Sequence, residues 1–230
     1  MGFTFDFDGL EDLRLSLPGD YQPYNAATAL TAVKALQGLG WEISEAAIRK
    51  GLEEVRWPAR FEVVRQGNPT FILDGGHNPQ GAQMVADSLR RHFPGRQAIF
   101  IFGVMADKDY GAMADAILPL AKRIFTVTPD SPRALPAQEL AHFIEGRRAK
   151  AAQPPEGAMQ AAIGAGPLTG GGCAGRVPQD IEVTPCATIP AAVEAAFAAA
   201  GPGDVICAFG SLYMAGDVSD AVRAHGEALT

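Results

Sequence analysis

The sequence predicts an α/β fold, a Rossmann-like and mostly parallel six-stranded sheet preceded by a small α+β unit. From Phe61 onward, short apolar runs alternate with stretches of helical periodicity, as in parallel strands joined by helices. The first sixty or so residues instead carry a hairpin pattern and two helical stripes, too little for an independent core. Hydrophobic residues make up 47% of the 230 positions, which is typical of a globular protein.

The opening segment, residues 1–59, reads as the tail of a larger domain. Polar and apolar residues alternate over Phe3–Phe7 and again over Leu13–Leu17, which predicts a hairpin that turns at Asp8-Gly9. A helix is expected over Asn25–Leu39, and Ser44 has the position of an N-cap for a second helix. The apolar stripes of these helices are Ala26, Leu30, Val33 and Leu36 in the first and Ile48, Leu52 and Val55 in the second.

The second domain is predicted over residues 60–230. Strands are expected near 61–66, 70–74, 97–102, 123–128, 181–184 and 204–208, and helices near 79–92, 110–120, 137–146, 189–200 and 212–224. Between these elements, the 146–180 stretch is rich in Gly, Ala and Pro and predicts a flexible insertion, with a short helix over 157–163 as an alternative for part of it.

Composition excludes several classes of function. The net charge of −7 argues against a nucleic-acid-binding surface. Cys173, Cys186 and Cys207 lie far apart, without the spacing of a zinc or redox motif, and no apolar run approaches the length of a membrane span. We therefore expect a cytoplasmic protein without a metal site of its own and without a nucleic-acid or membrane partner.

The stretch from Phe71 to Pro79 reads as a nucleotide-site loop. A buried strand ends in Asp74, Gly75-Gly76 allows close approach of a ligand, and Asn78-Pro79 is a helix start. Ligands bind at this carboxyl edge in open α/β sheets. The alternative is an ordinary turn in which Asp74 caps a helix and His77 is merely polar.

Two further clusters follow predicted strands. Lys108 lies between Asp107 and Asp109, where it could hold an anionic substrate; alternatively, the loop is solvated and one carboxylate caps the next helix. Gly210-Ser211 offers backbone N–H groups and a hydroxyl to a carboxylate or phosphate, although Ser is also an ordinary N-cap.

The last cluster lies at the domain junction. In Trp57-Pro58-Ala59-Arg60, the arginine could act across an interdomain cleft or form a salt bridge between the domains. The phosphate-cradling motif Gly-x-x-x-x-Gly-Lys-Ser/Thr does not occur in these 230 residues.

Taken together, these motifs occur in the order found in folylpolyglutamate synthases. Residues 19–30, Trp57–Arg60, Leu73–Pro79, Asp107–Asp109 and Gly210–Tyr213 carry the match, and the chain resembles the carboxyl-terminal portion of the bifunctional folylpolyglutamate synthase/dihydrofolate synthase family within the Mur ligase superfamily. Tyr21 stands where the family often has His, Ala59 stands where Gly is usual, and the 146–180 insertion is longer than the typical connection.

The resemblance implies an ATP-dependent ligase that joins L-glutamate to dihydropteroate or tetrahydrofolate through an acyl phosphate. It implies that residues 1–59 end the central ATPase domain and that the rest of that domain, with most ligands for Mg²⁺, is absent. By position, Gln22, Asn25, Asp74 and Asn78 would contact ATP, Arg60 its phosphates, and His77 the reacting groups, whereas Asp107, Lys108 and Ser211 would bind glutamate.

We expect the chain to be monomeric and inactive alone, because the P-loop is missing. Two alternatives remain open: a non-catalytic module that binds a nucleotide or an amino acid, and part of another Mur-type ligase that adds a different amino acid.

Overall fold

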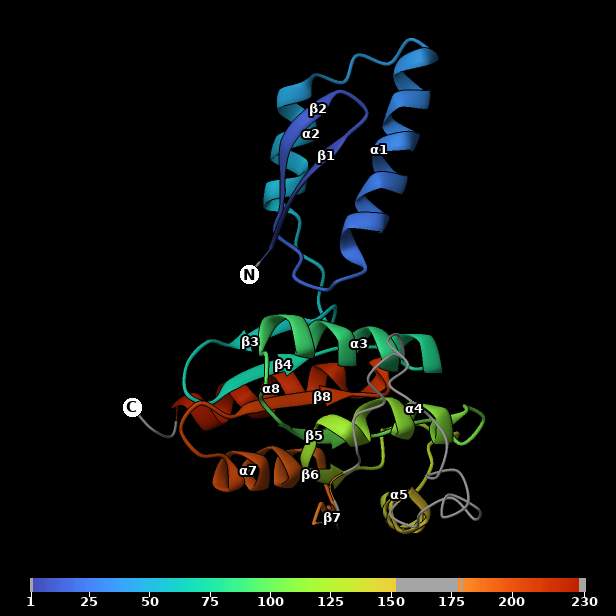
Figure 1. Cartoon of the computed structure of the whole chain (residues 1–230), viewed down its shortest axis with the longest axis vertical. Helices are drawn as coiled ribbons and strands as arrows, with labels where there is room; N and C mark the ends of the chain where they lie inside the picture. The colour runs from blue at the N-terminus through green and yellow to red at the C-terminus, as the bar shows by residue number, and fades with distance from the viewer. Residues whose placement is uncertain (1, 152–177, 179, 228–230) are drawn as a thin grey trace, which may run out of the picture.

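The chain forms two units, which the computed structural model describes over residues 2–151, 178 and 180–227. A small amino-terminal unit of one hairpin and two helices stands beside a larger α/β unit, next to α3 and β3 at one edge of the sheet (Figure 1). The predicted 146–180 insertion lies mostly outside the described residues, as does the alternative helix over 157–163.

The amino-terminal unit contains β1 (Phe3–Phe7), β2 (Leu10–Leu15), α1 (Gln22–Gly38) and α2 (Glu45–Glu54). The hairpin turns at Asp8-Gly9 as predicted, with φ of 46° and 84°, the left-handed backbone that a two-residue turn of this kind needs. The second strand was predicted over 13–17 but runs over 10–15, because the Ser16 N–H and hydroxyl bond to the carbonyls of Leu52 and Glu53 at the end of α2.

The larger unit is built on a six-stranded sheet in the order β3-β4-β8-β5-β6-β7. The strands are β3 (Glu62–Arg65), β4 (Thr70–Leu73), β5 (Ala98–Phe102), β6 (Ala121–Thr126), β7 (Glu182–Pro185) and β8 (Val205–Phe209). Only β3, at the edge, is antiparallel to its neighbour; the other pairs are parallel. This confirms the predicted Rossmann-like, mostly parallel sheet.

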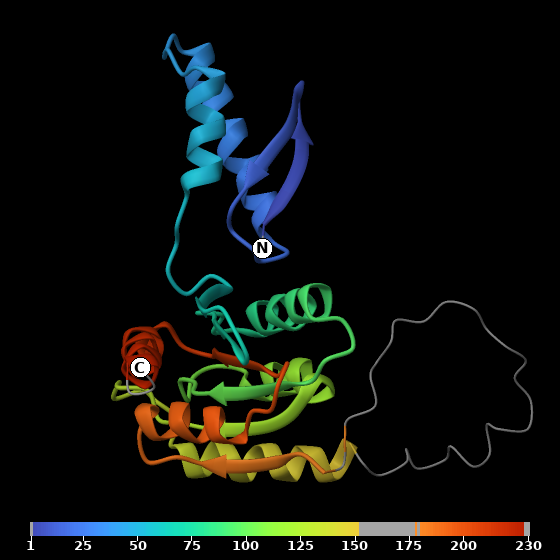
Figure 2. The same cartoon turned by 90° about the vertical axis from the view of Figure 1, so that its left-hand side faces the viewer.

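Helices cover both faces of this sheet (Figure 2). One face packs against α3 (Pro79–His92), α4 (Tyr110–Ile117) and α5 (Ala137–Ala151), and the other packs against α7 (Ile189–Ala199) and α8 (Ala215–Glu227). Successive residues of β5 alternate between the two cores: Phe100 and Phe102 face the first, and Ile99 and Ile101 face the second. Such strands are buried on both sides, which explains their continuous apolar sequence.

Several helix limits differ from the predicted ones for local reasons. A 3₁₀ turn, η1 (Leu118–Leu120), follows α4, and η2 (Leu212–Met214) precedes α8, so the helices predicted over 110–120 and 212–224 are each divided. Helix α1 begins three residues earlier than predicted, with Pro23 in its first turn, where proline is tolerated. Helix α5 passes Gly146 and continues to Ala151. None of the helices in the described ranges is both long and apolar enough to cross a bilayer.

Candidate functional site

Three loops meet at the carboxyl edge of the sheet, because β8 lies between β4 and β5. They are the loops after β4 (74–78), β5 (103–109) and β8 (210–211). Glycines allow them to touch: a Cβ on Gly75 would lie 2.8 Å from Cγ of Leu212, and one on Gly210 would lie 2.7 Å from the Phe102 ring and would collide with the Gly103 carbonyl. Three clusters that lie far apart in the sequence thus form one edge.

Asp74 is buried in the first loop, with 2% of its surface exposed. Its Oδ1 accepts a hydrogen bond from the Gly76 N–H at 2.6 Å, and its Oδ2 accepts from the Phe61 N–H at 2.7 Å and from the Tyr21 hydroxyl at 3.2 Å. Burial raises the pKa of Asp74 above the ordinary value, although these donors and nearby Arg60 oppose the shift. Both carboxylate oxygens are therefore engaged by the protein itself.

His77 and Asn78 complete this loop in different ways. The exposed His77 ring places Nδ1 3.0 Å from the Gly75 carbonyl oxygen. A carbonyl only accepts, so Nδ1 carries the proton, and in the neutral ring Nε2 is left as an acceptor. Asn78 is the N-cap of α3, and its Oδ1 accepts from the Gly81 N–H at 2.7 Å. The predicted helix start is confirmed, and the Asn78 side-chain oxygen is used by the cap.

The second loop presents one cation among carboxylates. Lys108 is half-buried and its Nζ lies 3.4 Å from Asp107, which Arg133 approaches to 3.5 Å. Asp109 is the N-cap of α4 and accepts from the Ala112 N–H at 3.0 Å. The alternative reading of this cluster is thus correct for Asp109, while Asp107 and Lys108 stay available to a ligand, since exposed ion pairs of this length contribute little.

Ser211 in the third loop is 2% exposed, and its hydroxyl oxygen accepts from the Tyr213 N–H at 3.1 Å. It caps η2, which agrees with the N-cap alternative. Leu212, the next residue, is 46% exposed, and its side chain lies over Gly75.

Arg60 lies on a short arch, residues 59–62, between the two units. Its neighbours Ala59 and Phe61 have left-handed φ values of 53° and 49°. Non-glycine residues in this region of backbone space are strained and concentrate at functional sites. Within the described part of the chain, no carboxylate forms a salt bridge with Arg60. The predicted alternative of an interdomain salt bridge is therefore not what the structure shows.

Arg60 shares one hollow of about 570 Å³ with Gln22, Asn25 and Trp57. Gln22 is buried, and its Oε1 accepts from the Asn25 amide at 3.1 Å. Three of the five residues predicted to contact nucleotide and phosphates thus line the same space, whereas Asp74 and Asn78 do not line it. The remaining lining is apolar and comes from β2, the facing sides of α1 and α2, and the segments next to them at Leu17, Ile43 and Val55. The structure brings together Gln22, Asn25 and Arg60 around this hollow, and His77, Lys108 and Ser211 at the sheet edge.

Sequence reasoning missed the contacts that join the units. One is the hydrogen bond from Tyr21 to Asp74, and another is that of His92, whose Nε2 donates to the Pro18 carbonyl at 2.6 Å while its ring packs near Phe61. Asp20 adds two more, since its N–H donates to the Ser88 hydroxyl at 3.0 Å and its carboxylate lies 3.4 Å from Arg91. No local pattern marked His92, which is simply the last residue of α3.

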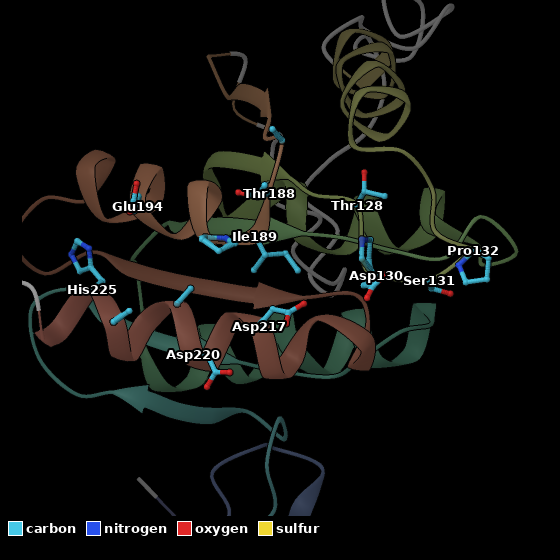
Figure 3. A pocket seen from close by; sticks show the side chains of 15 residues that line it. Thr128, Asp130, Ser131, Pro132, Thr188, Ile189, Glu194, Asp217, Asp220 and His225 are labelled. Atoms are coloured by element: carbon cyan, nitrogen blue, oxygen red, sulfur yellow. The ribbon is translucent and has the colours of Figure 1, made fainter.

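The larger hollow, of about 1060 Å³, lies elsewhere, between α7, α8 and the loop after β6 (Figure 3). Its charged lining consists of Asp130, Glu194, Asp217 and Asp220, together with His225 and without Lys or Arg. Carboxylates repel phosphates and amino-acid carboxylates, so this hollow does not suit the anionic ligands for which the sheet edge provides Lys108. We assign the site to the sheet edge.

The residues present do not form a metal site. In the ranges that the structure covers, no three His, Cys, Asp or Glu side chains lie together as ligands of one ion would. Cys186 and Cys207 are free thiols, and burial raises the pKa of both. A magnesium ion that accompanies a nucleotide would find at most two such side chains together in these ranges.

Comparisons with known proteins agree with this geometry. The family model described as the glutamate ligase domain of Mur ligases matches residues 59–212. The folylpolyglutamate synthase of Lacticaseibacillus casei is 38% identical over 149 residues, which cover 63% of this chain and 34% of that protein. A diaminopimelate-adding ligase of Corynebacterium efficiens, UDP-N-acetylmuramoyl-L-alanyl-D-glutamate–2,6-diaminopimelate ligase, is 28% identical over 216 residues, 92% of this chain and 35% of that protein.

Among solved structures, the Mycobacterium tuberculosis folylpolyglutamate synthase in complex with ADP and AMPPCP superposes with a TM-score of 0.69 and 25% identity. The match covers 94% of this chain and 42% of that one. The chain spans about a third of the length of the curated relatives it matches.

Proposed function

The chain belongs to the Mur ligase family through its glutamate ligase domain, and from this premise we propose that it is the glutamate-binding part of an ATP-dependent ligase that extends dihydropteroate or folates with L-glutamate. The observation that carries the proposal is the hollow at the junction, which Gln22, Asn25 and Arg60 line. The arch that bears Arg60 is joined to the loop after β4, because the Gly75 N–H donates to the Ala59 carbonyl. Convergent polar groups in a mainly apolar hollow are typical of ligand sites.

In this proposal the reaction has two steps. The γ-phosphoryl group of ATP passes to the acceptor carboxylate, which gives an acyl phosphate and ADP; the glutamate amine then attacks the acyl carbon, and phosphate leaves as the amine loses a proton. Arg60 neutralises charge on the transferred phosphoryl group. Because His77 Nδ1 is engaged by the Gly75 carbonyl, Nε2 of the neutral ring is left as an acceptor and can take the proton of the amine. Mg²⁺ would offset phosphate charge, and the described residues hold no cluster of three ligands for it.

Glutamate is a dianion with one ammonium group, and the sheet edge offers complementary charges. Lys108 can pair with a glutamate carboxylate, and Asp107 beside it can bind the ammonium group. Ser211 can donate its hydroxyl proton, because its oxygen is the acceptor in the bond to Tyr213.

The opposite wall of the cleft, in this proposal, is a preceding ATPase domain with the P-loop. Two observations support it. Leu39 and Trp41 are 79% and 63% exposed near the tips of α1 and α2. Apolar surface of this kind is usually covered by another part of the protein. The curated relatives are also about three times as long as the matched segment.

Calorimetry on the chain tests the glutamate assignment. We expect L-glutamate to bind, and Lys108→Ala to weaken binding by about tenfold or more, as loss of a charged hydrogen bond does. Lys50→Ala is the matched control, because Lys50 is exposed on α2 in the other unit. Equal affinities of the Lys108→Ala and Lys50→Ala variants would contradict the assignment.

A ligation assay with ATP, glutamate and dihydropteroate or tetrahydrofolate tests whether the reaction needs the proposed preceding ATPase domain. We expect no turnover from these 230 residues alone, and turnover would refute the role given to the preceding domain.

The match to the diaminopimelate-adding ligase over 92% of the chain favours one second candidate, a ligase for another amino acid. The same calorimetry with diaminopimelate in place of glutamate distinguishes the two, because a second ammonium group is unfavourable beside Lys108 unless Asp107 receives it. Tighter binding of diaminopimelate than of glutamate would favour the second candidate.

A further inference from the structure

The carboxylate of Asp74 is a junction of three structural elements. This buried side chain accepts hydrogen bonds from Gly76 in the loop after β4, from Phe61 in the arch and from Tyr21 in the amino-terminal unit. Buried carboxylates with several donors fix their surroundings, because leaving any one of these polar groups unpaired is costly.

The arch needs such an anchor because its backbone is strained. Ala59 and Phe61 both hold left-handed φ, and Arg60 lies between them. Three hydrogen bonds hold the arch: the Ala59 N–H donates to Glu62 at 2.8 Å, the Ala59 carbonyl accepts from the Gly75 N–H at 2.8 Å, and the Phe61 N–H donates to Asp74 at 2.7 Å. A strained backbone persists where several surrounding contacts hold it in place. Asp74 makes one of these contacts at Phe61, the residue that follows Arg60.

Tyr21 extends this anchor to the other unit. It precedes α1, is half-buried, and donates to Asp74 across 53 positions of sequence. Burial and the nearby Asp74 charge raise its pKa well above the ordinary value, so the hydroxyl keeps its proton and remains a donor. Gln22 follows it directly, and Asn25 lies one turn further along α1.

We propose that Asp74 and Tyr21 are positioning residues that hold Arg60 and the Gln22–Asn25 turn in a fixed relation around the shared hollow. Asp74 orients Arg60 through the Phe61 N–H, and Tyr21 sets the distance between α1 and the sheet edge. Asp74 would thus act indirectly, by positioning Arg60 through Phe61. This role is separate from the nucleotide contact that the family resemblance implies for Asp74.

Amide hydrogen exchange on the full chain tests the Asp74 part. In Asp74→Asn, one carboxylate oxygen becomes an NH₂ group that cannot accept, so we expect the Phe61 or Gly76 amide to exchange at least about tenfold faster. Amides of β5 and β6 should keep their rates, and ¹⁵N relaxation of the Arg60 Nε should show new mobility. Unchanged exchange at both amides, or a uniform increase over the sheet, would overturn the proposal.

Tyr21→Phe tests the role proposed for Tyr21. It leaves the hydrogen bonds from the Phe61 and Gly76 N–H groups to Asp74 in place, so the role of Tyr21 can be tested even where Asp74→Asn does not fold. Residual dipolar couplings should show a changed orientation of α1 relative to the sheet, because the bonds that remain, from His92 to Pro18 and from the Asp20 N–H to Ser88, hold only the segment before α1. Tyr24→Phe is the matched control, because Tyr24 lies on the same helix and is 78% exposed. If the couplings of Tyr21→Phe equal those of Tyr24→Phe and of the unmodified chain, Tyr21 does not position α1 and this part of the proposal is wrong.

The importance of Arg60 rests on the proposed function, whereas exchange rates and couplings report on the arch and the two units whether or not glutamate binds. The two proposals therefore fail separately.

Discussion

Gly210→Ala should be among the most damaging single-methyl substitutions at the candidate site. Gly210 has φ of 111°, which costs a residue with a side chain about 1–2 kcal/mol. Its added Cβ would lie 2.7 and 2.8 Å from two Phe102 ring atoms and would overlap the Gly103 carbonyl oxygen. Phe102 is fully buried and stacks on Phe209 at 4.7 Å, so it has no room to move. Overpacking of this kind costs about 1–3 kcal/mol.

The two contributions sum to about 2–5 kcal/mol of lost unfolding free energy. For a chain of this size each kcal/mol lowers Tm by about 2–4 °C, so we expect a fall of roughly 4–20 °C. Urea unfolding followed by circular dichroism measures the same loss as a lower midpoint at unchanged slope. The variant should also bind glutamate more weakly if the proposed function holds, because the Ser211 loop follows directly.

Gly146→Ala is the internal control for this experiment. Gly146 is exposed in the interior of α5, and nothing lies within 4 Å of a Cβ built on it. The same chemical change should there raise stability by about 0.5–1 kcal/mol, because alanine is the better helix former. A Gly210→Ala variant within about 0.5 kcal/mol of the unmodified chain would show that the loops after β5 and β8 are not locked together, and would refute the reasoning.

Three further predictions concern single side chains. Asn78→Ala should cost about 1 kcal/mol in urea unfolding through loss of the α3 cap while Asn78→Ser retains most of it, and equal stability of all three proteins would contradict the cap. Burial raises the pKa of Asp204, but the hydrogen bonds from Lys122 and from the Gly201 N–H outweigh burial, so the pKa lies below its ordinary value. The ionised carboxylate therefore stabilises the fold above about pH 4. This contribution is lost as the pH falls through the lowered pKa. The stability gap between Asp204→Asn and the unmodified chain should accordingly close in acid, and a gap constant from pH 7 to pH 3 would be inconsistent with this. Cys207 is fully buried with its pKa raised, so iodoacetamide should label it only as fast as the chain unfolds, as mass spectrometry can show; rapid labelling of the native protein would contradict its burial.

Features set by neighbouring residues could be predicted from the sequence. The Asn78-Pro79 pair predicts the start of α3, Ser44 predicts the start of α2, and Asp8-Gly9 predicts the hairpin turn; all three are confirmed. In each case a short-range hydrogen bond or backbone preference decides the outcome. The alternation of apolar strands with helices likewise predicts the parallel sheet.

Features set by distant residues could not be predicted. The end of β2 depends on bonds between Ser16 and the last turn of α2, nearly forty positions away. The left-handed Ala59 and Phe61 are types that rarely adopt this conformation, so no propensity marks the arch. The sequence could not decide whether Ser211 and Asp109 cap helices or bind a ligand, because the same side-chain oxygen suits both roles.

The location of the site follows from strand order combined with charge. The insertion of β8 between β4 and β5 is a property of the fold, and it alone brings residues 74–78, 103–109 and 210–211 to one edge. Volume by itself would select the hollow between α7 and α8, which is nearly twice as large as the one at the junction. Its carboxylates make it unsuitable for a nucleotide or for glutamate, whereas Arg60 at the junction has no salt bridge within the described residues and Lys108 has only a long, exposed one. Arg60 lies near the buried Asp74 carboxylate, but a cation without a salt bridge still attracts an incoming anion, so the smaller hollow at the junction is the better candidate.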